Sequence, residues 1–383
     1  MAELRALIAR MLPLSGITIG YIGHFDPGYA RNRTLMKALR RAGATVIPIS
    51  DLRRFPRRAP RLARTVATSG VDVLVTGFPG HTDVGTAKLA TAFRSVPIVF
   101  STLTSLWETS TDRHGIRRNS VAGFRYRLTD WLSCSLADSI WLDTRSHIDW
   151  FAREFGIPDT KFRRVWVGAD DEVMRPAPRA RAEPFTVFFY GTFIPLQGIE
   201  HIVEAASLVG AQRDGIRFVL CGDGQTFAQV EALANRSPRA NVTFLPRRPP
   251  HALSQLIAQS DVCLGIFGTG EKTQRVIPNK VFDALACARP VITADTPAAR
   301  ESLVDGRHAW LCPAGDPDAL AAAIVKASED DAGREAVARS GHELFRRRFS
   351  IDAISRDVAP LIHEVLGSAD SATAGGRPSP VTP

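Results

Sequence analysis

Apolar residues along this chain come in short runs that alternate with helical patterns. Runs rich in Val, Ile and Phe predict buried strands, and apolar residues spaced three or four apart predict amphipathic helices. In the first half, the predicted strands are residues 17–22, 44–49, 71–76, 97–100, 138–142 and 163–167. The predicted helices between them are residues 31–42, 84–95, 121–135 and 145–155. Strands that alternate with helices favour a parallel, doubly wound sheet.

The second half repeats this alternation. Its predicted strands are residues 186–190, 217–221, 242–245, 262–266, 291–293 and 308–311. Its predicted helices are residues 199–209, 226–235, 252–259, 279–287 and 317–327, followed by two long helices at 332–348 and 352–365. The pattern therefore predicts an α/β protein with two Rossmann-like, doubly wound parallel-sheet domains that face each other across a cleft.

Composition shifts mark the expected domain boundaries. The stretch PAPRARAEP, rich in proline and charge, predicts a linker at residues 176–184. It separates an N-terminal domain, residues 1–175, from a C-terminal domain, residues 185–349. A C-terminal helix is expected at residues 350–366, and the low-complexity tail at 367–383 is expected to be disordered. The first residues do not resemble a signal peptide.

The 383-residue length suits two domains, and the five cysteines form no C-x-x-C pair. Buried, reduced thiols are the favoured interpretation, which fits a cytoplasmic protein. Residues 1–180 hold 27 Lys and Arg against 16 Asp and Glu, a net charge of +11, whereas residues 181–383 carry −2. This basic half predicts an acidic partner, although solvated surface charge is a strong alternative.

One turn in the second half has the character of a phosphate site. The segment FFYGTFIPLQGIEHIV reads as a strand that breaks at Gly191 and restarts as a helix near Gly198. The first N–H groups of a helix have no partner within it, and together with the helix dipole they attract phosphate. We therefore expect a phosphorylated ligand at this turn.

A second segment, PNKVFDALACARPV, adds charge to that picture. Proline predicts a helix start near Asn279, and Lys280 and Asp283 fall on one face of the helix. A lysine takes phosphate charge and a carboxylate accepts ribose hydroxyls, so the pair suits a nucleoside diphosphate. A surface ion pair on an ordinary helix is the alternative.

These segments, with CGDG at 221–224 and SDVCLGIF at 260–267, resemble the GT-B glycosyltransferases of the retaining, family-four type. In the first half the resemblance is weaker and lies in IGHFDPGYARN and PIVFSTLTSLWETSTDR. It implies a nucleotide-sugar donor held by the C-terminal domain and an acceptor held by the N-terminal one. It also implies that the C-terminal helix crosses back onto the first domain.

Three positions depart from the family pattern. Thr192 and Gln197 stand where the family usually has Arg and Lys, and Arg275 stands in place of the first acid of its E-x7-E pair. The second acid aligns with Asp283. Lys280 and Arg275 are expected to replace the missing cations, as in a similar subgroup with Asn-Lys before the acid.

The resemblance and the patterns together nominate two groups of residues. The expected donor-binding residues are Gly191, Thr192, Gln197, Gly222, Asp223, Lys272, Asn279, Lys280 and Asp283, with residues 244–247 lining the nucleotide. The expected catalytic residues are Lys280, Arg275, Glu108 and Asp112, the last two orienting the acceptor hydroxyl after the strand at 97–100.

The loop after the first strand supplies the expected acceptor or cleft residues, which are Gly23, His24, Asp26, Arg31 and Asn32. It is not a G-x-G-x-x-G fingerprint, so no dinucleotide is expected. For Arg31, helix capping or solvent exposure is an equal alternative. Downstream, the arginines between Arg53 and Arg64 lie among apolar residues and predict contact with anionic lipid, or else a solvated loop broken by prolines.

The resulting hypothesis is a cytoplasmic, bacterial, retaining glycosyltransferase of polysaccharide or glycolipid assembly, peripheral on the inner membrane face through Arg53–Arg64. Its substrate is a UDP- or GDP-linked sugar, its acceptor is a glycan, glycolipid or small molecule, and it has no cofactor. No metal is expected, because no His/Cys cluster occurs. The alternatives are a non-catalytic binder of nucleotide sugar or glycan, and a nucleotide-sugar hydrolase or epimerase. Nucleic-acid binding is disfavoured because no recognition motif is visible.

Overall fold

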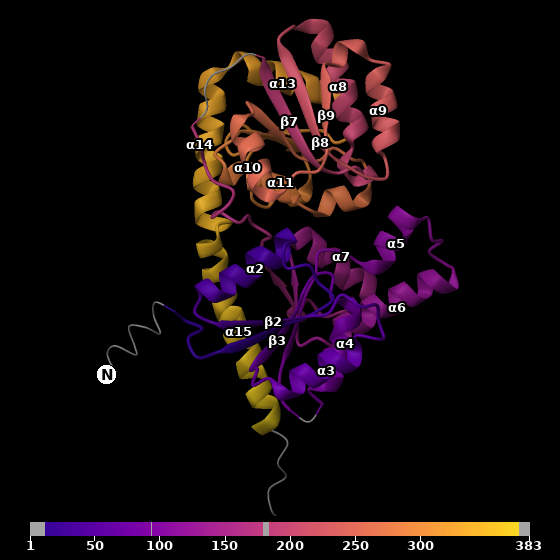
Figure 1. The fold of residues 1–383 in the computed structure, drawn as a ribbon, viewed down its shortest axis with the longest axis vertical. Helices are drawn as coiled ribbons and strands as arrows, with labels where there is room; N and C mark the ends of the chain where they lie inside the picture. Colours follow the sequence, from indigo (N-terminus) through magenta and orange to yellow (C-terminus); the bar gives the residue numbers. More distant parts are fainter. Residues whose placement is uncertain (1–11, 93, 179–183, 375–383) are drawn as a thin grey trace, which may run out of the picture. The chain divides into compact units, whose positions relative to one another are not determined.

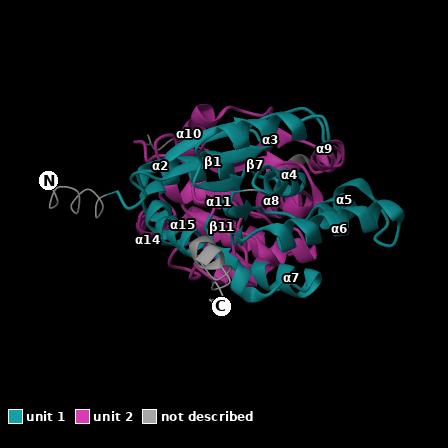
Figure 2. Cartoon of the chain, turned by 90° about the horizontal axis from the view of Figure 1, so that it is seen from below, with its two compact units in different colours: residues 1–143, 148–166, 351–383 teal, residues 144–147, 167–350 magenta. Residues whose placement is uncertain are grey.

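The structure is a computed structural model that describes residues 12–92, 94–178 and 184–374. Two compact units divide the chain (Figure 2). Unit 1 comprises residues 1–143, 148–166 and 351–383, and unit 2 comprises residues 144–147 and 167–350. Residues 1–11, where the sequence predicts no signal peptide, lie outside the described residues.

Unit 1 is built on a sheet of six parallel strands. They are β1 (Thr18–Gly23), β2 (Thr45–Ser50), β3 (Val73–Thr76), β4 (Ile98–Ser101), β5 (Ser139–Leu142) and β6 (Phe162–Arg164). Their order across the sheet is β2-β1-β3-β4-β5-β6. The helices are α2 (Ala30–Arg41), α3 (Ala59–Thr68), α4 (His81–Ala90), α5 (Leu106–His114), α6 (Val121–Leu136), α7 (Arg145–Phe155) and α15 (Ile351–Ala374), with a short η1 (Asp159–Lys161).

Successive residues of these strands enter opposite cores, as the period of two requires. Val73 and Val75 join a cluster with α2, whereas Leu74 between them joins the cluster on the other face. The first cluster also contains Ile354 and Val358, so α15 packs on α2 (Figure 1). α15 continues to Ala374, beyond the point where the sequence predicts disorder, and residues 375–383 lie outside the described part.

Unit 2 also has six parallel strands. They are β7 (Phe185–Thr192), β8 (Ile216–Asp223), β9 (Val242–Leu245), β10 (Val262–Leu264), β11 (Val291–Ala294) and β12 (Trp310–Cys312). The helices are α8 (Ile199–Gln212), α9 (Phe227–Asn235), α10 (Pro250–Gln259), α11 (Asn279–Ala286), α12 (Pro297–Arg300), α13 (Pro317–Glu329) and α14 (Asp331–Arg348). Three short 3-10 turns complete it: η2 (Pro195–Gln197), η3 (Pro238–Ala240) and η4 (Glu271–Arg275).

The strand order of unit 2 is β12-β11-β10-β7-β8-β9. The chain starts in the middle, runs to one edge through β8 and β9, and then returns to the other side of β7. The order therefore reverses between β7 and β10, and ligands of such sheets bind beyond the carboxyl ends of the strands at this point. The fold class is the predicted one, with two parallel, doubly wound sheets.

Candidate functional site

The turn after β7 lies at this switch point and contains two close backbone approaches. Gly191 pairs in register with Gly222 of β8, and a Cβ on Gly222 would lie 2.0 Å from the Gly191 carbonyl oxygen. A Cβ on Gly198, which has φ +61°, would lie 2.4 Å from the Gly268 nitrogen. Only glycine fits at these two positions, which allow the loops after β7, β8 and β10 to meet.

Lys280 fills the space beside that turn. It belongs to the first turn of α11, its side chain is buried, and its ammonium donates a hydrogen bond to the carboxamide oxygen of Gln197. The Nζ atom lies 4.3 Å from the centre of the Phe189 ring. A Cβ on Gly191 would lie 3.1 Å from the same Nζ. The ammonium therefore reaches the turn where the sequence lacks the expected Arg and Lys.

The partners of this ammonium are neutral. Among the described residues, no carboxylate forms an ion pair with Lys280, and burial lowers its pKa to about 7. A buried cation without a counter-ion is costly, because desolvation disfavours the charged form. This arrangement favours an anionic ligand, because its negative charge would serve as the counter-ion of Lys280.

Asp283 lies one turn further along α11 and is also buried. The Tyr190 hydroxyl donates a hydrogen bond to its Oδ2 atom. Burial, then the neighbouring Asp283 carboxylate, raises the pKa of Tyr190 well above its usual value, so the phenol keeps its proton. Tyr190 thus fixes the carboxylate predicted to hold ribose.

The other predicted donor residues surround this centre in unit 2. Lys272 and Arg275 are buried in η4, where the Nη1 atom of Arg275 lies 3.6 Å from the Glu271 carboxylate. The Thr144 hydroxyl donates to the Arg275 carbonyl oxygen. Asn279 is the first residue of α11. η4 therefore leads directly into the helix that carries Lys280.

At the end of β8, Asp223 pairs in register with Thr192 and accepts a hydrogen bond from the Arg247 guanidinium. Its backbone oxygen also accepts from the Phe193 nitrogen, at 2.9 Å. Both charged side chains of the Asp223–Arg247 pair are exposed. The structure thus brings together two segments that the sequence assigns separately to the nucleotide.

In unit 1, the loop after β1 is held by a buried ion pair. Gly23 has φ +129°, and the backbone nitrogen of His24 donates to Asp83 Oδ2 at 3.0 Å. Arg58 Nε donates to the other oxygen of Asp83 at 2.7 Å, and both side chains are buried. Unlike Lys280, this buried cation has a carboxylate partner.

Arg31 and Asn32 open α2 and are buried. Arg31 Nη1 donates to the carbonyl oxygens of Val165 and Trp166, at 2.6 and 3.1 Å. Burial lowers the pKa of Arg31. The Asn32 carboxamide bonds to Tyr21, to the Asp26 carbonyl and to both backbone groups of Phe78. Asn32 therefore holds the loop after β1, and Arg31 joins α2 to the segment after β6. The Asp26 side chain is exposed and accepts a hydrogen bond from the Gly28 nitrogen.

The predicted acceptor carboxylates both lie on α5. Glu108 is buried in its first turn, and Asp112 is exposed near its end. Ahead of the helix, the Ser105 hydroxyl caps the Glu108 nitrogen and also donates to Asp130 at 2.6 Å. Asp130 lies 3.3 Å from His81 Nε2.

The basic segment at Arg53–Arg64 is partly helical, and its arginines differ in burial and in partners. Its second part forms α3, with Leu62 buried in the core. Arg58 is committed to Asp83, and Arg53 bonds to Asp51. The remaining arginines of the segment, Arg54, Arg57, Arg61 and Arg64, are exposed. The prolines shorten the helix, with Pro60 in its first turn, and do not prevent it.

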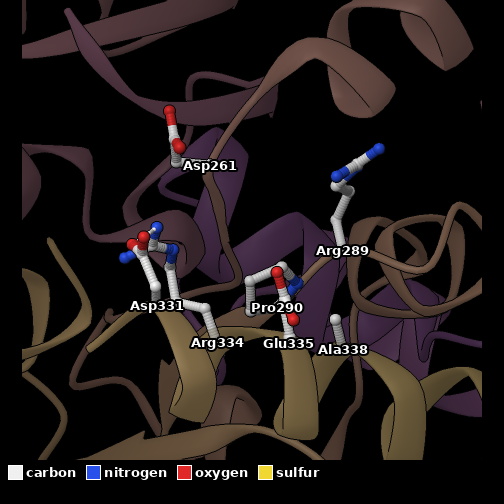
Figure 3. A pocket seen from close by; sticks show the side chains of 7 residues that line it. All are labelled: Asp261, Arg289, Pro290, Asp331, Arg334, Glu335 and Ala338. Carbon is white, nitrogen blue, oxygen red and sulfur yellow. Dashed lines mark hydrogen bonds and ion pairs between the residues drawn. The ribbon is translucent and has the colours of Figure 1, made fainter. Parts of the chain in front are cut away.

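Unit 2 also contains a cavity of about 320 Å³ that none of the predicted donor-binding residues lines (Figure 3). Its lining includes Asp261, Arg289 and Pro290, which precede β10 and β11 and so mark the amino ends of the strands. Asp261 accepts a hydrogen bond from the Thr186 nitrogen at the start of β7. The cavity therefore lies at the edge opposite to Gly191 and is not the candidate donor site.

Two residues of the site were not expected from the sequence. Phe189 and Tyr190 read as strand core, yet one contacts the Lys280 ammonium and the other fixes Asp283. Three consecutive aromatic residues directly before a glycine turn were the available signal. Across the described residues, no group of three or more His, Cys, Asp or Glu could hold a metal, and no helix is long and apolar enough to cross a membrane. All five cysteines are buried and free, as the sequence predicts.

Comparisons with known proteins converge on one family. Residues 184–330 match the family described as "Glycosyl transferases group 1". The chain is 24% identical, over 56% of its length and 53% of the relative's, to the putative colanic acid biosynthesis glycosyltransferase WcaL of Salmonella typhimurium. It is 29% identical, over 47% of its length and 48% of the relative's, to the phosphatidyl-myo-inositol mannosyltransferase of Mycobacterium leprae. The chain thus matches about half the length of these curated relatives.

The fold matches over almost the whole chain. Anabaena HepE, solved in complex with UDP and glucose, superposes with a TM-score of 0.69 at 15% identity, covering 91% of this chain and 100% of HepE. At that identity the likeness shows the fold. Residues 184–330 therefore match the group 1 glycosyltransferases, and the two six-stranded parallel sheets have the GT-B fold.

Proposed function

We propose that the chain is a glycosyltransferase that moves a sugar, with retention of configuration, from a nucleoside diphosphate sugar to a hydroxyl group. The acceptor belongs to a glycan, glycolipid or small molecule, and the reaction takes place in a bacterial cytoplasm. The single observation that supports the proposal best is the buried Lys280 ammonium beside Gly191, with no carboxylate partner among the described residues. The names of its relatives, which concern colanic acid and phosphatidyl-myo-inositol, support polysaccharide or glycolipid assembly.

Donor cleavage needs stabilisation of charge more than it needs a strong base. When the sugar leaves, negative charge develops on the β-phosphate, and a preorganised cation in a water-poor site stabilises it. Lys280 supplies that cation, and the N-termini of α8 and α11 add their dipoles. Arg275 and Lys272 in η4 are the next candidates.

The remaining groups position the reactants. Asp283, which is held in place by the hydrogen bond from Tyr190, accepts hydrogen bonds from the ribose hydroxyls, and the Asp223–Arg247 pair borders the nucleotide. The acceptor hydroxyl attacks the oxocarbenium-like sugar from the face that the diphosphate leaves, and its proton passes to the departing phosphate oxygen. Glu108 and Asp112 orient the acceptor. This scheme needs no metal ion.

A panel of nucleotide sugars, starting with UDP-glucose and including GDP-linked sugars, tests the proposal through the release of nucleotide with and without acceptor extracts. We expect acceptor-dependent release. Binding without release would instead support a non-catalytic relative, and release without acceptor would support a hydrolase.

The matching variant is Lys280→Ala, with the exposed Lys326→Ala in α13 as control. Loss of Lys280 should lower turnover at least about tenfold, which corresponds to ~1.4 kcal/mol of transition-state stabilisation. Lys326→Ala should leave turnover unchanged. An unaltered rate in Lys280→Ala would remove the lysine from the mechanism.

A further inference from the structure

The helix α6 of unit 1 is amphipathic in the reverse sense. Its buried residues are Gly123, Asp130, Ser133 and Cys134. Its exposed residues include a line of large apolar side chains, which we call the apolar stripe: Val121, Phe124, Leu128, Trp131 and Leu132. At about 100° per residue, the stripe covers an arc of about 100° opposite the buried side.

The exposure of the stripe is large enough to need an explanation. Val121 is 80% exposed and Phe124 is 64% exposed. Soluble surfaces carry single apolar residues, but a contiguous row on one helix marks an interaction site. α5 and α6 pack on each other and project together from one side of unit 1 in both views (Figures 1 and 2).

Hydrogen bonds on the buried side lock the rotation of the helix. Asp130 accepts hydrogen bonds from the Ser105 hydroxyl and from the backbone nitrogens of Leu106 and Trp107, at 2.6 to 3.0 Å. The Ser133 hydroxyl donates to the His81 carbonyl at 2.7 Å. Turning the stripe inward would break these bonds and leave a buried carboxylate without partners, which is costly. The stripe therefore faces outward by construction.

Positive charge frames the stripe. Between residues 112 and 128, the exposed charged side chains are Arg113, Arg117, Arg118, Arg125 and Arg127, against Asp112 alone. Of these, Arg127 is paired with Glu154 of α7 at 3.0 Å. Arg125 lies one turn after Val121 and directly follows Phe124 on α6. Apolar residues that include a tryptophan, bordered by arginines, match the interface of a bilayer with anionic headgroups. A second copy fits less well, because a twofold contact would bring the same arginines together.

We propose that α6 docks the protein on an anionic lipid bilayer, with the apolar stripe inserted among the acyl chains and the arginines on the headgroups. This inference is independent of glycosyl transfer, since vesicle binding requires neither donor nor acceptor. The proposed contact on α6 is a different site from the Arg53–Arg64 segment that the sequence predicts.

Co-sedimentation of the full chain with vesicles tests the proposal. The protein should bind phosphatidylcholine vesicles that contain phosphatidylglycerol, bind pure phosphatidylcholine poorly, and dissociate at high salt. The double variant Phe124→Ser/Leu128→Ser should bind at least about tenfold more weakly, because both side chains lose apolar burial. Leu89→Ser is the matched control, since Leu89 is 78% exposed on α4 of the same unit and should not matter.

Fluorescence locates the inserted residue. Brominated lipids should quench part of the tryptophan emission, and Trp131→Phe should remove that part. Equal binding to neutral vesicles, retained binding by the double variant, or loss of binding in Arg54→Glu/Arg57→Glu alone would overturn the proposal. So would gel filtration showing a dimer that the double variant dissolves, since the stripe would then be a contact between copies.

Discussion

Arg58 in unit 1 and Lys280 in unit 2 are both buried near the end of the first strand of their unit, but their partners differ in charge. In unit 1, Arg58 bonds to the Asp83 carboxylate, which in turn holds the His24 nitrogen in the loop after β1. In unit 2, Lys280 meets only the Gln197 oxygen and the Phe189 ring. A buried cation paired with a carboxylate cannot be removed without stranding its partner, whereas a buried cation without a counter-ion costs stability and keeps its charge available for a ligand. The contrast separates a structural ion pair from a candidate anion site.

The largest expected effect on stability comes from removing the cation of the Arg58–Asp83 ion pair. Arg58→Met leaves the Asp83 carboxylate buried without its cation, so the free energy of unfolding should fall by about 3–5 kcal/mol. Urea unfolding measures the change. The control is Arg41→Met, because Arg41 and its partner Asp352 are 51% and 57% exposed, and exposed pairs contribute little. Equal losses in both variants would show that the Arg58–Asp83 pair is not a special support.

The opposite sign is expected for the cation in unit 2. Lys280→Met removes an ammonium that burial disfavours, so it should raise the free energy of unfolding by on the order of 2 kcal/mol at pH 6. The folded-state pKa is about 7, below the unfolded value. The cost of burying the charge is therefore complete below pH 7, and it disappears as the pH rises toward the unfolded pKa.

Urea unfolding of the wild type and Lys280→Met across this pH range measures the difference. The stability gap between the two proteins should narrow steadily between pH 7 and about 10.4. A variant that is less stable than the wild type at pH 6 would mean that the lysine supports the fold, as Arg58 does.

The smallest effect compares two tyrosines with different acceptors. Tyr190 donates to the Asp283 carboxylate, whereas Tyr21 in unit 1 donates to the Asn32 carboxamide at 3.0 Å. Hydrogen bonds to charged groups are stronger, so Tyr190→Phe should cost about 2 kcal/mol and Tyr21→Phe about 1 kcal/mol. Thermal unfolding of the two variants ranks them, and the reverse order would indicate that Asp283 does not depend on Tyr190.

Local patterns predicted the sheets well and the contacts of single charges poorly. Every predicted strand is present, because short β-branched runs between turns are a strong local signal. Helices α3 and α5 were not predicted. The prolines near α3 suggested a loop, and the polar sequence LWETSTDRH of α5 has no helical spacing of apolar residues. Helix α15 runs further than its predicted end because its polar residues past Gly367 carry no apolar signal.

The candidate site shows the same limit. Lys280 was predicted as a donor-binding and catalytic residue because a lysine at a helix start is a local feature, and the structure places its ammonium beside the turn after β7. Arg58 was grouped with lipid-facing arginines, since its partner Asp83 lies 25 residues away and only the folded chain brings them together. The same is true of Tyr190 and Asp283, which are 93 residues apart.

We expect the Lys280 ammonium to complete its charge balance with the diphosphate of the donor. Because the pKa of free Lys280 is about 7, most molecules have a neutral lysine at pH 8, and a bound diphosphate should restore the proton. Calorimetric titration with UDP, and separately with GDP, in buffers of different ionisation enthalpy counts that proton. We expect net proton uptake at pH 8 in the wild type and none in Lys280→Met, which should also bind the nucleotide at least about tenfold more weakly. Equal affinity and equal proton exchange in the two proteins would contradict it.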